Sequence, residues 1–345
     1  CPVTISASST TIKGGNGLNV GAVNLKDNTQ STSLTLDAGV GDLTISKIGN
    51  LDAALASLNL LGNNLNLNGD IYTKGDISFE KPIKIGTTVN LQGASINLGD
   101  LSASGANGLT LTSSGAVSLA TLGTTDHNLG TVNINSASSL TLKGDLYSLS
   151  TVTLSGVSIK LGSNVTAFGD VTIKQTGSGP VFFEGVIHTQ GSIAFGGALT
   201  VTADTTLQGN KGITITGAIT PGSGNPALML DAGSNNPLTV NFAENSSNFF
   251  GLLTIKASTL SLSGTVNSNN SIAIDVPITI TSDTTIHSLG GYGGIALSSS
   301  LAGNSSNPAL TLQSDLGPID VKALGSANYF LGNVSFGDHF CNEAR

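Results

Sequence analysis

Short stretches in which aliphatic and polar residues alternate follow one another along almost the whole chain. Examples are the segments LTLDAG, LTLTSSG, VTLSG and ITITSD. Each places aliphatic side chains on one side and Thr, Ser or Asn on the other, which is the period of a half-buried β-strand. Gly, Asn, Asp or Ser follows nearly every stretch and favours a turn, so the pattern predicts many strands of about 4 to 6 residues. Only residues 50–61, NLDAALASLNLL, offer a candidate for a helix.

Longer segments repeat along the chain. NPALMLDAG at residues 225–233 matches NPALTLQSD at 307–315, and LTVTADTTL at 199–207 matches PITITSDTTI at 277–286. Matched prolines, Pro237 and Pro318, lie 81 residues apart, and the matched Asp204 and Asp283 lie 79 apart. A unit of ~80 residues fits about four turns of a parallel β-solenoid at ~20 residues per turn.

We therefore expect an all-β fold, a single right-handed parallel β-helix (β-solenoid) of ~17 turns that spans residues 1–345 as one domain built from ~80-residue repeat units. Aliphatic side chains would fill a narrow interior, while Thr, Ser and Asn would point outward. A propeller or a sandwich is the alternative architecture.

Units such as LTLDAG, LSLSG and ITITSDTTI resemble those of the β-strand-repeat surface proteins of Gram-negative bacteria, of the filamentous-haemagglutinin and autotransporter-passenger type. The resemblance covers residues 10–336. It implies a right-handed parallel β-helix, export, and a place on the cell surface or in a fibre. It supplies no catalytic residues.

Composition narrows the classes of function. Charged residues make up 10% and aromatic residues 4% of the chain, Trp is absent and the net charge is −8. Lysines are scattered singly and Arg345 is the only arginine, which argues against a nucleic-acid partner, because phosphate binding needs clustered cations. No apolar run approaches the ~18 residues of a membrane span. A first residue that is Cys indicates a chain that has been processed or cut from a longer one.

Candidate chemistry is sparse. Four histidines, His127, His188, His287 and His339, lack the spacing of metal ligands. The acidic residues are dispersed, and the nearest approach to a cluster, in GDIYTKGDISFE at residues 69–80, alternates like a solvated strand. We expect no catalytic, cofactor-binding or metal-binding residues, and no enzyme. A polysaccharide-active β-helix enzyme is an alternative, since glycoside hydrolysis needs only two well-placed carboxylates.

Aromatic residues recur in two matching segments. NFF at 248–250 contains Phe249 and Phe250, and NYF at 328–330 contains Tyr329 and Phe330. The favoured interpretation is that these aromatic side chains pack a loop against the core. The other is that they are exposed and contact a neighbouring molecule or a glycan.

The only two cysteines, Cys1 and Cys341, lie at opposite ends of the sequence. A solenoid of ~17 turns spaced ~4.8 Å apart is ~80 Å long, which is far beyond the reach of a disulfide. Cys341 of one molecule could instead pair with Cys1 of the next. Alternatives are a lipid-modified Cys1, as in exported lipoproteins, and a free Cys341.

These expectations combine into one functional hypothesis. Rods would stack head to tail into an extracellular or cell-surface bacterial filament, since an open heterologous contact gives a fibre. Strands near Val3 and Ile5 would pair with strands near Val334 and Phe336 of the next copy, locked by the intersubunit disulfide. The partner is thus a second copy of the chain, without a nucleic acid or membrane span. The alternatives are a surface adhesin that binds a glycan or host surface, and the polysaccharide-active enzyme.

Overall fold

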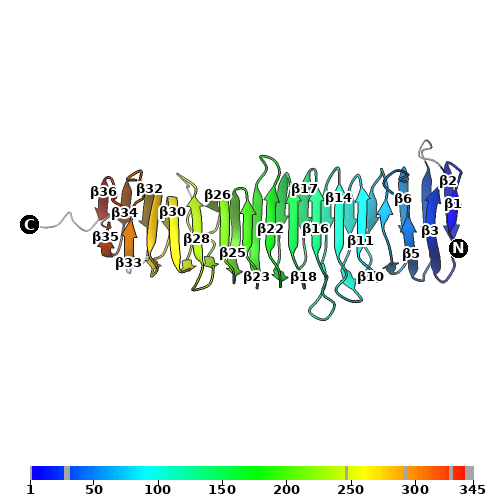
Figure 1. Ribbon diagram of the computed structural model, residues 1–345, viewed down its shortest axis with the longest axis horizontal. Coiled ribbons are helices and arrows are strands. Elements are labelled where there is room, and N and C mark those ends of the chain that lie inside the picture. The colour runs from blue at the N-terminus through cyan, green and yellow to red at the C-terminus, as the bar shows by residue number, and fades with distance from the viewer. Residues whose placement is uncertain (1, 27–31, 245–247, 291–293, 326–328, 339–345) are drawn as a thin grey trace, which may run out of the picture. The chain divides into compact units, whose positions relative to one another are not determined.

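The computed structural model describes residues 2–26, 32–244, 248–290, 294–325 and 329–338 (Figure 1). These residues form 36 strands and contain no helix. The fold is a parallel β-solenoid of about 15 turns. The predicted all-β solenoid is therefore confirmed, with a number of turns close to the ~17 expected.

The chain divides into two compact units, unit 1 (residues 1–169 and 173–179) and unit 2 (residues 170–172 and 180–345). The expectation of a single domain stays a prediction. The strands of unit 1 are β1 (Val3–Ile5), β2 (Ser9–Lys13), β3 (Leu18–Leu25), β4 (Ser33–Asp37), β5 (Leu43–Ile48), β6 (Ser57–Leu61), β7 (Leu65–Leu67), β8 (Ile71–Tyr72), β9 (Ile77–Phe79), β10 (Ile83–Ile85), β11 (Val89–Gly93), β12 (Ile96–Leu98), β13 (Leu101–Ala103), β14 (Leu109–Ser113), β15 (Val117–Leu119), β16 (Val132–Ser136), β17 (Ser139–Leu142), β18 (Leu146–Ser148), β19 (Val152–Gly156), β20 (Ser158–Leu161) and β21 (Val165–Ala167).

The boundary between the units divides β22 (Val171–Gln175). The strands of unit 2 are β23 (Val181–Thr189), β24 (Ile193–Gly196), β25 (Leu199–Gly209), β26 (Ile213–Pro221), β27 (Leu228–Asp231), β28 (Pro237–Phe242), β29 (Leu253–Lys256), β30 (Thr259–Ser268), β31 (Ile272–Ile274), β32 (Ile278–Ser288), β33 (Ile295–Ala302), β34 (Leu310–Ser314), β35 (Ile319–Leu324) and β36 (Val334–Asp338).

Three strands of each turn pair in parallel with the corresponding strands of the next turn in the middle of unit 1. Strands β10, β11 and β12 pair with β13, β14 and β15, respectively. The register places chemically similar residues beside each other. For example, Leu109 lies between Val89 and Val132. Parallel strands can be joined only by a crossover, which here is the rest of the turn.

Unit 2 uses longer strands that bend around a corner. Strand β32 and strand β25 each have 11 residues, and both are buried at their ends and exposed in the middle. The pairings of β23 with β25 and of β30 with β32 shift register at Phe183/Gly185 and at Leu262/Gly264. A bulge of this kind re-aims the strand and lets one long strand serve two faces of the solenoid.

The core consists mainly of Leu, Ile and Val, as the narrow interior requires. Phe183, Phe195, Phe242 and Phe250 are the largest side chains that are fully buried. The rings of Phe242 and Phe250 meet edge to face, with centroids 5.8 Å apart and an interplanar angle of 80°. No buried side-chain nitrogen or oxygen lacks a hydrogen-bond partner in the described residues.

The helix suggested for residues 50–61 is wrong. Gly49 has a positive φ of 65°, and the side chain of Asn50 accepts hydrogen bonds from the backbone N–H groups of Asp52 and Ala53, which closes a turn. Residues 57–61 of the segment form β6, in which Leu58 and Leu60 are buried and the residues around them are exposed. Pairing with β4 therefore overrides the helix propensity of Ala and Leu.

Candidate functional surfaces

Aspartate side chains join successive turns. The carboxylates of seven aspartates each accept a hydrogen bond, 2.8–3.1 Å long, from a backbone N–H of the next turn. These inter-turn aspartates are Asp70, Asp76, Asp100, Asp145, Asp170, Asp204 and Asp283. Hydrogen bonds to a charged acceptor are stronger than those between neutral groups. Seven of the acidic residues that the sequence shows as dispersed thus share one structural task.

Asp170 accepts two hydrogen bonds from one residue of the next turn. Its Oδ1 accepts hydrogen bonds from both the backbone N–H and the hydroxyl of Ser192, at 2.8 and 2.9 Å. These two bonds, with a smaller contribution from Lys211, hold the pKa of the Asp170 carboxyl below its usual value, against a small opposing effect of burial.

The two repeated sequence motifs of unit 2 contact each other. Asp204 of the segment ADTT binds the N–H of Ala227 in the NPAL segment that follows it, and Asp283 of the segment SDTT binds the N–H of Ala309 in the same way. The asparagine of each NPAL segment, Asn225 or Asn307, has a positive φ of 56° or 51°. The left-handed conformation suits Asn and turns the chain into the proline. The repeat therefore encodes a stacking contact.

Buried hydroxyl groups close the corners of unit 1. The Ser113 Oγ donates to the backbone oxygen of Ala94 at 2.7 Å, and the Ser136 Oγ donates to that of Gly115 at 2.7 Å. The same hydroxyls accept from the N–H groups two residues ahead, at Gly115 and Ser138. A buried polar group is tolerated where it is hydrogen-bonded in this way.

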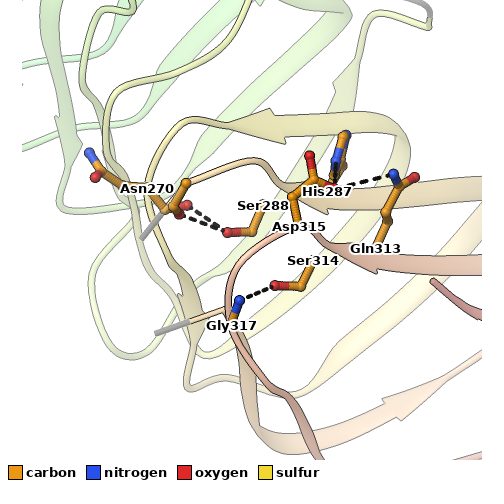
Figure 2. A network of polar contacts seen from close by, with 8 residues as sticks. Asn270, His287, Ser288, Gln313, Ser314, Asp315 and Gly317 are labelled. Atoms are coloured by element: carbon orange, nitrogen blue, oxygen red, sulfur yellow. Dashed lines mark hydrogen bonds and ion pairs between the residues drawn. The ribbon is translucent and has the colours of Figure 1, made fainter. Parts of the chain in front are cut away.

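The histidines occupy separate places. Figure 2 shows His287, whose Nε2 lies 3.1 Å from Asp315 Oδ1, with Gln313 beside it on the next turn. The Nδ1 of His188 lies 2.9 Å from the side-chain oxygen of Gln208. His127 lies in an exposed turn, and His339 is outside the described residues. No group of three or more His, Cys, Asp or Glu side chains in the described ranges could hold a metal ion.

Both cysteines proposed for the intersubunit disulfide, Cys1 and Cys341, lie outside the described residues. The proposed junction residues are in strands: Val3 and Ile5 belong to β1, which pairs with β3, and Val334 and Phe336 belong to β36, which pairs with β34. No helix in the described part of the chain has the length and apolarity to cross a membrane.

The two aromatic segments differ in their surroundings. Phe250 is 1% exposed and Phe249 is half-buried, whereas Tyr329 and Phe330 are exposed. Phe250 therefore packs against the core as expected, whereas Phe330, which is 61% exposed, does not. The backbone N–H groups of Gly251 and Gly332 donate equivalent hydrogen bonds to the carbonyl oxygens of Pro226 and Pro308. Gly251 directly follows Phe250, whereas one residue separates Phe330 from Gly332. The alignment by structure therefore differs by one position from the alignment by residue type.

A groove lies over unit 1 that the sequence patterns did not reveal. It has a volume of about 590 Å³, and its lining includes Gln92, Thr112 and Asn135 on β11, β14 and β16, with Leu51 and Lys74. The register places these three polar residues on one row, because Gln92 lies beside Thr112 and Thr112 beside Asn135. We call this feature the Gln92 groove. The sequence signal for this groove is the polar residue at the fourth position of three five-residue strands, VNLQG, LTLTS and VNINS.

A second hollow lies over unit 2 beside Asp283. Thr265, Thr285 and Thr311 form a row across β30, β32 and β34 there, and Glu244 also lines it. Its volume is about 370 Å³. Since Asp283 already binds the Ala309 N–H, this carboxylate of the hollow serves the stacking of turns.

Comparison with protein-family models, with curated proteins and with solved structures finds no match to this chain.

Proposed function

We propose that the chain is a structural subunit of an extracellular bacterial filament, in which β-solenoids stack head to tail. The supporting observation is the exposure of inward-facing side chains in the last described turn. Phe336 is 57% exposed, whereas Leu312, at the same register one turn earlier, is fully buried. Likewise Leu324 is 42% exposed and its neighbour Leu301 is buried. A further turn stacked on β35 and β36 would remove this apolar surface from water.

The first described turn exposes one inward-facing position in part, although Ile5 of β1 is buried. Ile12 of β2 is half-buried, whereas Leu36, beside it on β4, is fully buried. The neighbour of β1 in the described sheet is β3, so the other edge of β1 has no strand partner within the described residues. An edge of this kind is a template for another strand. A second copy entering in the same direction would continue the parallel ladder, and a contact between unlike ends propagates.

A mechanical role agrees with the way the turns are joined. Backbone ladders, inter-turn aspartates and corner hydroxyls link each turn to the next, which favours rigidity over a moving site. The acids nearest to a cluster are engaged with the next turn, since Asp70 binds Asn90, Asp76 binds Ser95 and Glu80 binds Asn97. We therefore propose a non-catalytic function, with the disulfide between Cys341 and Cys1 of the next copy as its lock.

Sedimentation of the chain under non-reducing conditions tests the proposal. We expect polymers, a ladder on non-reducing gels, and collapse of that ladder with reductant. A double variant, Leu324→Lys with Phe336→Lys, places charges on the terminal surface and should yield monomers. Leu149→Lys, which alters an exposed leucine in a turn of unit 1, is the matched control and should polymerise normally. A wild-type chain that sediments only as a monomer contradicts the proposal.

A further inference from the structure

The outer face of unit 1 carries a row of polar side chains that the stacking of turns does not use. We propose that the Gln92 groove binds a linear glycan through the side chains of Gln92, Thr112 and Asn135. This inference is independent of filament formation, because the groove lies on the side of unit 1 and not on the first or last described turn.

The groups that face the groove are side chains and not backbone. Around its floor, the N–H groups of Thr73, Ala94 and Ser114 already donate to carbonyl oxygens of Gln92, Gly75 and Gly93. The hydroxyl of Ser113 is engaged in the corner bonds described above. An extended peptide would therefore find no free strand edge to pair with, whereas a ligand that reads side-chain amides and hydroxyls would find them.

Three polar side chains in the row remain available. Gln92, Thr112 and Asn135 are exposed, and in the described part of the chain their side chains make no hydrogen bond with protein groups. An amide offers both a donor and an acceptor, and a hydroxyl does the same. Sugar hydroxyl groups are also both donors and acceptors, so they can form hydrogen bonds with all three side chains of the row.

The spacing of the row suits a polymer. The residues sit on neighbouring parallel strands at equal register, so they repeat at ~4.8 Å and the row spans about 10 Å. A linear oligosaccharide, which presents hydroxyl groups at regular intervals, can contact all three side chains and extend beyond them along the row.

The wall of the groove is apolar and held in place. Leu51 is 70% exposed, and the Asn50 side chain fixes its turn through bonds of 2.9 Å to the Asp52 N–H and 2.7 Å to the Ala53 N–H. Such a wall offers a surface for the C–H face of a sugar ring, as in ligand sites that combine apolar lining with a few polar groups.

The charge of the lining limits the class of glycan. Lys74 is the one charged residue that lines the groove in the described chain, and no carboxylate lines it. The site therefore accepts neutral sugars and, near Lys74, a sugar carboxylate or sulfate, but gives no advantage to a cationic one.

The test uses the full chain and a panel of neutral and acidic oligosaccharides of defined length, with dissociation constants measured by calorimetry. We expect binding to tighten from monosaccharide to oligosaccharide. Gln92→Ala, Thr112→Val and Asn135→Ala should each weaken binding about three- to tenfold, as loss of one hydrogen bond does. Thr141→Val changes an outward threonine of β17 that does not line the groove, and should leave binding unchanged.

Thermal unfolding checks that each variant keeps its fold, and exposed positions of this kind tolerate substitution. The inference is overturned if no oligosaccharide of the panel binds. It is also overturned if binding survives in the variant that combines Gln92→Ala, Thr112→Val and Asn135→Ala, or if it falls equally in Thr141→Val. These substitutions should leave filament formation unchanged, so failure of the glycan test leaves the assembly test intact.

Discussion

The carboxylate of Asp283 accepts a hydrogen bond from the backbone N–H of Ala309, 2.9 Å away and one turn later. Asp204 and Ala227 repeat this relationship at 2.8 Å. A side chain in one turn thus fixes the entry of the chain into a strand of the next turn. We expect such contacts to govern the stability of the solenoid.

Replacing Asp204 or Asp283 by Ala should lower the free energy of unfolding by about 1 kcal/mol each, since the carboxylates are exposed and charge-assisted hydrogen bonds weaken in water. Because the two sites lie in different turns, the effects should add. Urea unfolding measures them. Asp275→Ala, an exposed aspartate with no hydrogen bond in the described residues, is the control. Equal losses in all three variants would refute the role of the contacts.

Lowering the pH should reduce the contribution of Asp170 to the free energy of unfolding. The native pKa of this carboxyl is lowered by its bonds to Ser192, so its contribution is fully present above the unfolded pKa and is lost as the pH falls through the native pKa. Asp170→Asn should therefore flatten the acid side of a plot of urea midpoint against pH. Ser192→Ala should flatten it in part, because one of two donors is lost. An unchanged acid limb in both variants would count against this assignment.

Phe250→Ala should cost about 3–5 kcal/mol, because it opens a cavity beside Phe242 in the core. Phe330→Ala, in the matching sequence segment, should change the stability of the monomer by less than about 0.5 kcal/mol, since its ring is exposed. Thermal unfolding under conditions that keep the chain monomeric compares them. Similar costs for the two substitutions would contradict the different burial of the two segments.

Asn307 tests the turn that begins the second NPAL segment. Its φ of 51° strains a β-branched residue but not glycine. Asn307→Val should lower the free energy of unfolding by about 1–2 kcal/mol, and Asn307→Gly should have little effect. The same pair of substitutions at Asn225, with φ of 56°, provides an internal replicate. A neutral valine variant at both sites would argue against the left-handed turn.

The strands could be predicted from the sequence because alternation is local. Leu109 and Leu111 are buried and Thr112 is exposed, as the segment LTLTS indicates by itself. The inter-turn contacts could not be predicted, because the length of a turn varies. Asp76 binds a residue 19 positions ahead, and Asp283 binds one 26 positions ahead. The Gln92 groove escaped prediction for the same reason, as its row spans intervals of 20 and 23 residues.

The match between the aromatic segments shows a related limit of sequence periodicity. Residue type aligns Phe250 with Phe330. The hydrogen bonds of Gly251 and Gly332 give an alignment that differs from this one by one position. One extra residue decides which side chain points into the core. The exposure of Phe330 follows from that shift together with its place in the last described turn.

Negative-stain electron microscopy of the purified chain tests stacking between copies most directly. The account predicts unbranched filaments one molecule wide for the wild type and isolated particles for the Leu324→Lys, Phe336→Lys double variant. Isolated particles for the wild type across a wide range of protein concentration and under oxidising conditions would contradict it.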